Sequence, residues 1–279
     1  MEIKWLCPYW GQHPCEASAF IDKVLAAEYG GIEIDLPADK KFRTELLSEL
    51  EIMAGSQPGF VFVAQQVLPA ANEKVADYIS RMITHLEDIA FLRPDFINAH
   101  TGKDHFSFDD NCRVIDAVIN FSQQSGIRVL HETHRGRFSF HLATLIPYLY
   151  HFPELELTGD FSHFCVVSES LMEDQQELLE AILPHIAHLH ARIGFSQAPQ
   201  VNDPFAPEWA ATMETYIGWW ERVIRFRKSK GDAQFTITPE FGPVPYMPVL
   251  PYTQQPLSDQ WAINRKMKDL LTERFNRLL

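Results

Sequence analysis

The sequence predicts an α/β fold, a single (β/α)8 barrel that occupies residues 1–279 as one domain. The first observation is that short apolar, β-rich runs recur mostly about thirty residues apart, the length of one strand–helix–strand unit. The second is that segments between these runs carry apolar residues three or four positions apart, as amphipathic helices do. Strands that alternate with helices form a parallel sheet, and eight of them can close a barrel.

Each expected strand is a run of five to seven residues bounded by turn-forming or polar positions. The expected strands are IKWLC (3–7), GIEIDL (31–36), FVFVAQ (60–65), DFINAH (95–100), IRVLHE (127–132), ELELTGD (154–160), IAHLHAR (186–192) and FTITPEF (235–241). The clearest expected helices span residues 71–92, 111–124, 207–229 and 258–279. A capping-box pattern at Ser170 predicts that the helix after the sixth strand begins there.

Composition and charge limit the classes of function. The chain has 46% hydrophobic and 22% charged residues, typical of a globular protein, and a net charge of −13. This acidic balance speaks against a nucleic-acid partner, because phosphate binding depends on Lys and Arg. No apolar run approaches a membrane span, and the N-terminus lacks the pattern of a signal peptide. The four cysteines lack CxxC spacing, so we expect a cytoplasmic protein without a disulfide framework.

Ionisable side chains stand at the ends of four consecutive expected strands. Glu132 ends the fifth run, Asp160 ends the sixth, His188 and His190 lie in the seventh, and Glu240 lies in the eighth. The C-terminal ends of barrel strands converge on one mouth, where barrel enzymes have their active sites. Three carboxylates and one imidazole suit one divalent ion, Mn²⁺, Mg²⁺, Co²⁺ or Zn²⁺. Glu132, Asp160, His190 and Glu240 are therefore the predicted metal ligands.

Each of these residues also has an ordinary structural explanation. A strand-end Asp160 commonly caps a turn or helix, and Glu240 could be exposed. His188 and His190 share one face of a strand by the period of two, so spacing does not decide which of them belongs to the core. All four explanations would have to hold at successive strand ends, where clustered carboxylates need a counter-charge. The combination therefore favours the metal site.

Four short motifs carry a resemblance to a known superfamily. They are HET (131–133), GDFSH (159–163), HLHAR (188–192) and PEFG (239–242). In this order they resemble the xylose isomerase-like TIM barrels, which include sugar isomerases and epimerases and also endonuclease IV. The resemblance covers essentially the whole chain. The segment HARIGFSQAPQVNDP (190–204) is most similar to an uncharacterised bacterial branch of the superfamily.

The resemblance implies roles for individual residues. The metal ligands of keto-sugar 3-epimerases correspond to Glu132, Asp160, His190 and Glu240, and a substrate-contacting histidine corresponds to His163. In those enzymes a substrate arginine lies further after the ligand histidine than Arg192 does, which departs from the pattern. The Asp-x-His pair of the endonucleases is missing near VNDPF (201–205). The absent pair and the acidic charge both speak against DNA repair.

The expected reaction is an isomerisation or epimerisation of a sugar or of an acidic or phosphorylated sugar. A divalent ion would stabilise an enediolate, while Glu132 and Glu240 flank the substrate as catalytic residues. The sequence does not choose between isomerase and epimerase. A lyase or dehydratase would use the same chemistry, and a non-catalytic sugar- or metal-binding barrel is a further alternative. A homo-oligomer is compatible with the sequence.

Additional polar side chains are expected in the loops at the mouth. The candidate substrate-binding residues are His163, Arg192, His100, Lys103, His134 and Arg135. Together with Arg137, their cations would suit a carboxylate or phosphate group. The alternative is that these cations pair with Asp104, Asp109 or Glu169 and only brace the loops. Residues 242–257, rich in proline and aromatic side chains, are expected to form a stiff loop over the mouth.

Overall fold

The computed structural model describes residues 1–279, and its eight strands form a closed parallel barrel in the order β1 to β8. The predicted (β/α)8 fold class is therefore confirmed. The strands are β1 Glu2–Pro8, β2 Gly31–Asp35, β3 Val61–Gln66, β4 Phe96–Ala99, β5 Arg128–Glu132, β6 Leu157–Gly159, β7 Ile186–His190 and β8 Gln234–Thr238. Each of them lies within or overlaps the run expected from the sequence.

Helices follow the strands as the periodicity predicts. They are α1 Ala17–Ala26, α2 Lys40–Ser56, α3 Val75–Ala90, α4 Phe108–Ser125, α5 Leu142–His151, α6 Phe161–Ser168, α7 Gln176–Ile182, α8 Ala210–Ser229 and α9 Gln260–Asn276. Short 3-10 helices cover Leu183–His185 and Pro207–Trp209. None of the helices is long and apolar enough to cross a membrane.

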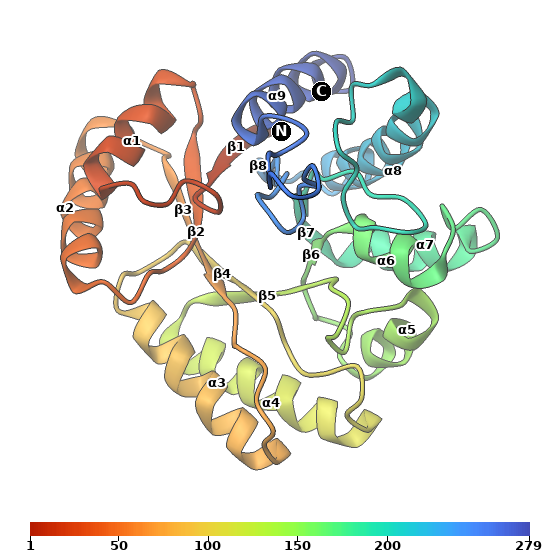
Figure 1. Ribbon diagram of the computed structural model, residues 1–279. Coiled ribbons are helices and arrows are strands. Elements are labelled where there is room, and N and C mark those ends of the chain that lie inside the picture. The colour runs from red at the N-terminus through yellow and green to blue at the C-terminus, as the bar shows by residue number, and fades with distance from the viewer. The chain divides into compact units, whose positions relative to one another are not determined.

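The chain divides into two compact units. The first unit comprises residues 1–5, 133–135 and 139–279, and the second comprises residues 6–132 and 136–138. In the second unit, β2, β3, β4 and β5 pair in parallel, and α3 packs beside α4 (Figure 1). In the first unit, β6, β7 and β8 pair in parallel, and α8 packs against α9. That residues 1–279 form one domain stays a prediction.

Local signals explain where several helices begin and end. The Ser107 hydroxyl accepts a hydrogen bond from the Asp110 amide at the start of α4, and Gly126 ends that helix with a positive φ of 73°. Asp259 caps α9 by accepting from the Ala262 amide. These caps satisfy amide and carbonyl groups that have no partner inside the helix.

The helix start predicted at Ser170 is wrong. The helix α6 begins at Phe161, directly after β6, and α7 begins at Gln176. The Ser170 hydroxyl instead accepts a hydrogen bond from the Met172 amide at 3.1 Å within a tight turn. Met172 has a positive φ of 56°, which a helix cannot contain. The capping pattern therefore serves a local turn.

Candidate metal centre

Asp160 follows β6 and begins α6. Its carboxylate caps this helix, because Oδ1 accepts hydrogen bonds from the Ser162 amide at 2.9 Å and from the Ser162 hydroxyl at 2.5 Å. The Thr133 side chain fixes the backbone, since its hydroxyl accepts from the Asp160 amide at 2.8 Å and donates to the Asp160 carbonyl at 2.9 Å. Asp160 is fully buried. The capping role and a ligand role are compatible, because the cap uses Oδ1 and leaves Oδ2 for other contacts.

His190 and Glu240 approach Asp160 from the next two strands. His190 ends β7, and its Nδ1 atom lies 2.9 Å from Oε2 of Glu240. The potential ligand atoms of Asp160, His190 and Glu240 all lie within 4.8 Å of one another. The exposed fractions are 0% for Asp160 and His190 and 5% for Glu240. The structure therefore brings together three of the four predicted ligands in the first unit.

This donor set fits a divalent ion. Ligand atoms at about 2.0–2.4 Å from an ion can stand no more than roughly 4–5 Å apart, as these three do. Two carboxylates and one imidazole are donors that Mg²⁺, Mn²⁺ or Zn²⁺ accepts. Asp160, His190 and Glu240 would hold the ion, and its counter-charge would offset the repulsion between the two acids.

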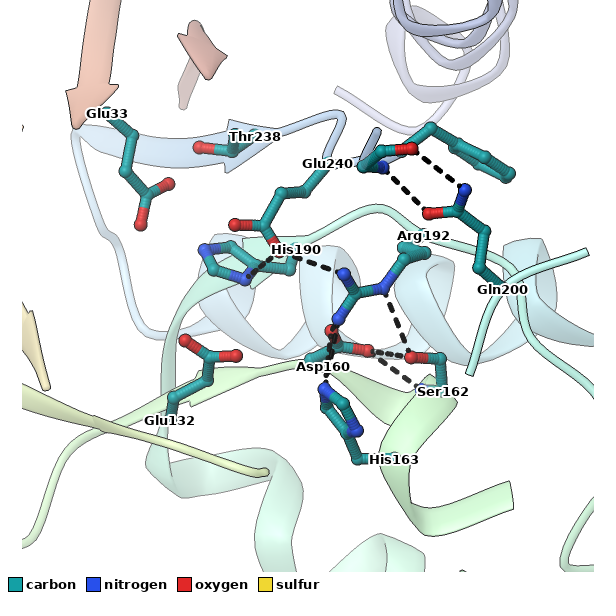
Figure 2. A network of polar contacts seen from close by, with 12 residues as sticks. Glu33, Glu132, Asp160, Ser162, His163, His190, Arg192, Gln200, Thr238 and Glu240 are labelled. Atoms are coloured by element: carbon teal, nitrogen blue, oxygen red, sulfur yellow. Dashed lines mark hydrogen bonds and ion pairs between the residues drawn. The ribbon is translucent and has the colours of Figure 1, made fainter. Parts of the chain in front are cut away.

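A buried guanidinium already lies among these residues. Arg192 is 2% exposed, and its Nη2 contacts Oδ2 of Asp160, while its Nη1 lies 3.5 Å from Oε2 of Glu240 (Figure 2). The same side chain reaches Ser162 Oγ at 3.4 Å and His163 Nε2 at 3.0 Å. The structure thus places Arg192 on the predicted ligands, a contact that the sequence analysis did not foresee. A substrate-binding role for Arg192 stays a prediction.

His188 belongs to the core. Its Nδ1 lies 2.7 Å from the Thr236 hydroxyl and 3.0 Å from the Thr236 carbonyl, and Nε2 lies 3.3 Å from the Thr238 hydroxyl. Both ring nitrogens are therefore occupied by neighbouring β8. Spacing alone could not separate His188 from His190, and the structure separates them by their partners.

Two side-chain amides hold the segment that follows Glu240. Gln200 accepts from the Gly242 amide at 2.7 Å and donates to the Gly242 carbonyl at 3.1 Å (Figure 2). Asn264 of α9 does the same for Phe241, at 2.8 Å and 3.1 Å. Both amides are buried. They replace the ladder bonds that end with β8 and so fix the backbone beside Glu240. No local sequence signal indicates these contacts, because Gln200 and Asn264 are far along the chain from the residues that they hold.

Aromatic and basic side chains surround His163 in the first unit. The His134 and His163 rings lie 3.8 Å apart between centroids, and Tyr246 approaches His163 edge-on. The guanidinium groups of Arg135 and Arg192 lie over the Tyr246 ring at 5.0 Å and 4.7 Å from its centroid. Tyr246 belongs to residues 242–257, which contain no helix or strand, as expected for a loop, and it contacts the candidate site. The placement of this loop over the mouth stays a prediction.

The fourth predicted ligand, Glu132, ends β5 in the second unit. Its Oε2 accepts a hydrogen bond from Asn98 Nδ2 at 2.8 Å and lies 3.0 Å from His100 Nε2. Arg137 Nη2 lies 3.3 Å from the other nitrogen of His100. The assignment of Glu132 to the same ion as the other three ligands stays a prediction.

A second buried carboxylate, missed by the sequence analysis, lies beside this group. Glu33 on β2 is 1% exposed, and its Oε1 accepts hydrogen bonds from Gln65 Nε2 at 3.2 Å and Asn98 Nδ2 at 3.1 Å. Asn98 thus donates to both Glu33 and Glu132. The alternation of side chains along GIEID places Glu33 on the face opposite Ile32 and Ile34, which does not by itself show that this face is buried.

Lys103 is a further predicted substrate-binding residue. Its side chain is 9% exposed and its ammonium lies 5.5 Å from the centroid of the Tyr78 ring. Burial and the nearby Arg137 and Arg81 charges lower the pKa of Lys103. Lys103 does not pair with Asp104, as the alternative of a loop-bracing cation would require. Asp104 contacts His105 instead. The role of Lys103 stays a prediction.

No family model matches the sequence, and no curated protein matches it. Solved structures do match the fold. A probable 3-DHS dehydratase, AsbF, from Bacillus anthracis has a TM-score of 0.64 and 16% identity, over 98% of this chain and 99% of that chain.

Two other solved structures carry the superfamily's name. A xylose isomerase-like TIM barrel protein from Mycobacterium smegmatis, in complex with magnesium, has a TM-score of 0.60 and 12% identity over 97% of each chain. A xylose isomerase domain-containing protein from Salmonella typhimurium has a TM-score of 0.62 and 11% identity, over 97% of this chain and 96% of that chain. The chain therefore has the fold of the xylose isomerase-like TIM barrels, as the four motifs led us to expect.

Proposed function

We propose that the chain is a divalent-metal-dependent isomerase or epimerase that moves a proton at a carbon beside a carbonyl group of a sugar. The observation that carries the proposal is the buried group of Asp160, His190 and Glu240, whose potential ligand atoms lie within 4.8 Å of one another. Oxygen-rich donor sets of this kind suit Mg²⁺ and Mn²⁺. The magnesium in the Mycobacterium smegmatis structure supports Mg²⁺ as the first ion to test.

The bound ion would supply Lewis-acid polarisation of neighbouring hydroxyl and carbonyl oxygens of the substrate. The protein would supply the proton acceptor and donor. We assign these roles to Glu132 and Glu240, as expected from the sequence. Asn98 and His100 hold the Glu132 carboxylate in a defined orientation, and the amides of Gln200 and Asn264 hold the backbone after Glu240. Fixed carboxylates are what a base needs to stay within hydrogen-bond reach of a carbon.

We further propose that the substrate carries an anionic group, which Arg135 binds. Arg135 is half-buried, stacks on Tyr246 and forms no ion pair with a carboxylate in the structure. An arginine with a free guanidinium edge matches carboxylate and phosphate geometry. Arg192 is the weaker candidate in this state, because Asp160 and Glu240 already engage it. His134 and His163, whose rings touch, would contact neutral parts of the substrate.

A second candidate is a lyase of the dehydratase kind. The name of the Bacillus anthracis protein supports it, since that protein shares this fold over almost the whole of both chains. A dehydratase would remove the same kind of proton from its substrate, and the substrate would then lose a hydroxyl group as water. The two candidates therefore share their first step and differ in the product.

The test is solvent isotope exchange. Protein stripped by a chelator and reloaded with Mg²⁺ or Mn²⁺ is incubated in D₂O with ketoses, aldonates and sugar phosphates, and NMR follows deuterium at carbon. We expect metal-dependent exchange at one position and no exchange with Glu240→Gln. A product of unchanged mass, apart from deuterium, indicates an isomerase or epimerase, and loss of water indicates a lyase.

Two controls separate the steps of the proposal. Ion binding alone should raise the melting temperature, because a ligand at a hundredfold excess over its Kd adds about 2.7 kcal/mol to the free energy of unfolding. Arg135→Ala should weaken binding of acidic substrates by about 1.5–3 kcal/mol and leave neutral sugars unaffected. A chain that binds neither Mg²⁺ nor Mn²⁺ contradicts the proposal. A chain that binds the ion and sugars without any exchange is a non-catalytic barrel.

A further inference from the structure

We propose that Arg192 is an internal counter-cation that competes with the divalent ion for Asp160 and Glu240, so that the ion binds only when the guanidinium leaves. The inference rests on the proposed function, because it concerns the same carboxylates. It adds a property that the donor set alone does not imply: the metal affinity is held down by a side chain of the protein itself.

The competition follows from which atoms are engaged. Arg192 Nη2 contacts Oδ2 of Asp160, the oxygen that the helix cap leaves for other contacts. Arg192 Nη1 lies 3.5 Å from Oε2 of Glu240, which is the oxygen nearest to His190 Nδ1. An ion bound by Asp160, His190 and Glu240 would take Oδ2 of Asp160, because the cap engages Oδ1, and a Glu240 oxygen beside the same guanidinium. Figure 2 shows the guanidinium between the two carboxylates.

Electrostatics makes joint occupation unfavourable. Arg192 is 2% exposed and stays charged, because the guanidinium does not lose its proton in proteins. A dication on the same carboxylates would stand at contact distance from that charge, with little water to screen the repulsion. The guanidinium neutralises the two acids when no ion is present, and an ion would take over this role.

The structure offers the displaced guanidinium a second contact. Its central carbon already lies 4.7 Å from the centroid of the Tyr246 ring, and arginine stacks well on aromatic faces. Arg135 lies over the same ring at 5.0 Å and touches neither Asp160 nor Glu240. Arg135 is therefore a matched control, because it carries the same charge and the same stacking partner without the contact to the ligands.

The experiment is a calorimetric titration of chelator-treated protein with Mn²⁺ alone. We expect Arg192→Met to lower the Kd at least about tenfold relative to the wild type, and Arg135→Met to change it by less than about threefold. The inference is overturned if the wild type binds Mn²⁺ and Arg192→Met binds it equally or less tightly, or if both variants gain equally. If no protein in the series binds Mn²⁺, the metal site itself is contradicted, and the competition with it.

A second measurement does not depend on a variant that folds. Crystals of the wild type grown with Mn²⁺ should show the ion on Asp160 and Glu240 and the Arg192 guanidinium away from Oδ2 of Asp160. An ion bound to Asp160 while Arg192 keeps its present contact would show that the two cations share the site, which overturns the inference.

Discussion

The buried carboxylates of the two units have different kinds of partner. In the first unit, Asp160 and Glu240 share a charged group, the guanidinium of Arg192. In the second unit, Glu33 and Glu132 accept hydrogen bonds from the neutral amide of Asn98, at 3.1 Å and 2.8 Å. The first arrangement places a cation between the two acids, while in the second one neutral amide donates to both acids.

The difference has a functional meaning. One cation can be exchanged for another, so carboxylates that share a guanidinium are also carboxylates on which a metal ion can bind. An amide cannot be exchanged in this way, and it fixes the direction of the carboxylate that it donates to. The second arrangement therefore suits a group that must stay oriented, such as the base that we assign to Glu132. Three predictions test this contrast.

The largest effect is expected from Asp160→Ala. The variant removes the carboxylate that Arg192 Nη2 contacts and leaves a buried charge with reduced compensation, which costs about 3–5 kcal/mol of unfolding free energy. Urea unfolding of chelator-treated protein measures the loss. The double variant Asp160→Ala/Arg192→Met should recover part of it, because the buried guanidinium that lost Asp160 is gone, while Glu240 loses its own contact with Arg192. If the single and double variants are equally unstable, Asp160 does not stabilise the fold by balancing the charge of Arg192.

A loss of similar size is expected from Asn98→Leu, which has a similar volume but no donor. Glu33 and Glu132 each lose a hydrogen bond, and bonds to charged groups contribute about 1.5–3 kcal/mol. Gln65→Leu is the matched control, because Gln65 donates to Glu33 alone at 3.2 Å and should cost less. Urea unfolding and the rate of isotope exchange are both measured. A variant with full exchange activity would contradict the orienting role of Asn98.

Much of the fold could be predicted from the sequence, because strands buried in a parallel barrel are local apolar runs with polar ends. Glu132, Asp160, His190 and Glu240 stood out for the same reason, since each lies at or just beyond the end of a strand. Local sequence patterns gave a wrong prediction where one pattern fits both a helix start and a turn. The capping pattern at Ser170 forms a turn, and the helix begins at Phe161 instead.

The relations between distant residues could not be predicted. Clustered acids need a counter-charge, and the sequence alone indicates a metal ion for this role, yet the structure shows Arg192 supplying such a charge. The sequence HLHAR contained a hint, because residues two apart in extended chain share a face and place Arg192 with His190. The contacts of Gln200 with Gly242 and of Asn264 with Phe241 have no local sequence pattern, because folding alone brings these residues together.

The smallest effect is a loss of stability at low pH. It tests whether the folded second unit keeps the imidazole of His131, next to Glu132, neutral. His131 precedes Glu132, and its Nδ1 lies 2.7 Å from the Thr101 hydroxyl. Burial lowers the pKa of His131 from 6.5 to about 3. Between these values the unfolded chain binds a proton that the folded chain does not, so stability falls as the pH drops below about 6.5.

At pH 5 the loss from His131 is about 2 kcal/mol, since each pKa unit corresponds to about 1.4 kcal/mol. His131→Gln removes the titrating ring, so the wild type should lose about 2 kcal/mol more than this variant between pH 7 and pH 5 in urea unfolding. Thr101→Val removes the hydroxyl partner but keeps the imidazole, so it should lower stability and retain the pH dependence. If the wild type and His131→Gln have parallel pH profiles, His131 takes up a proton in the folded chain. The contrast would then be limited to the amide contacts, because a cation would form next to Glu132.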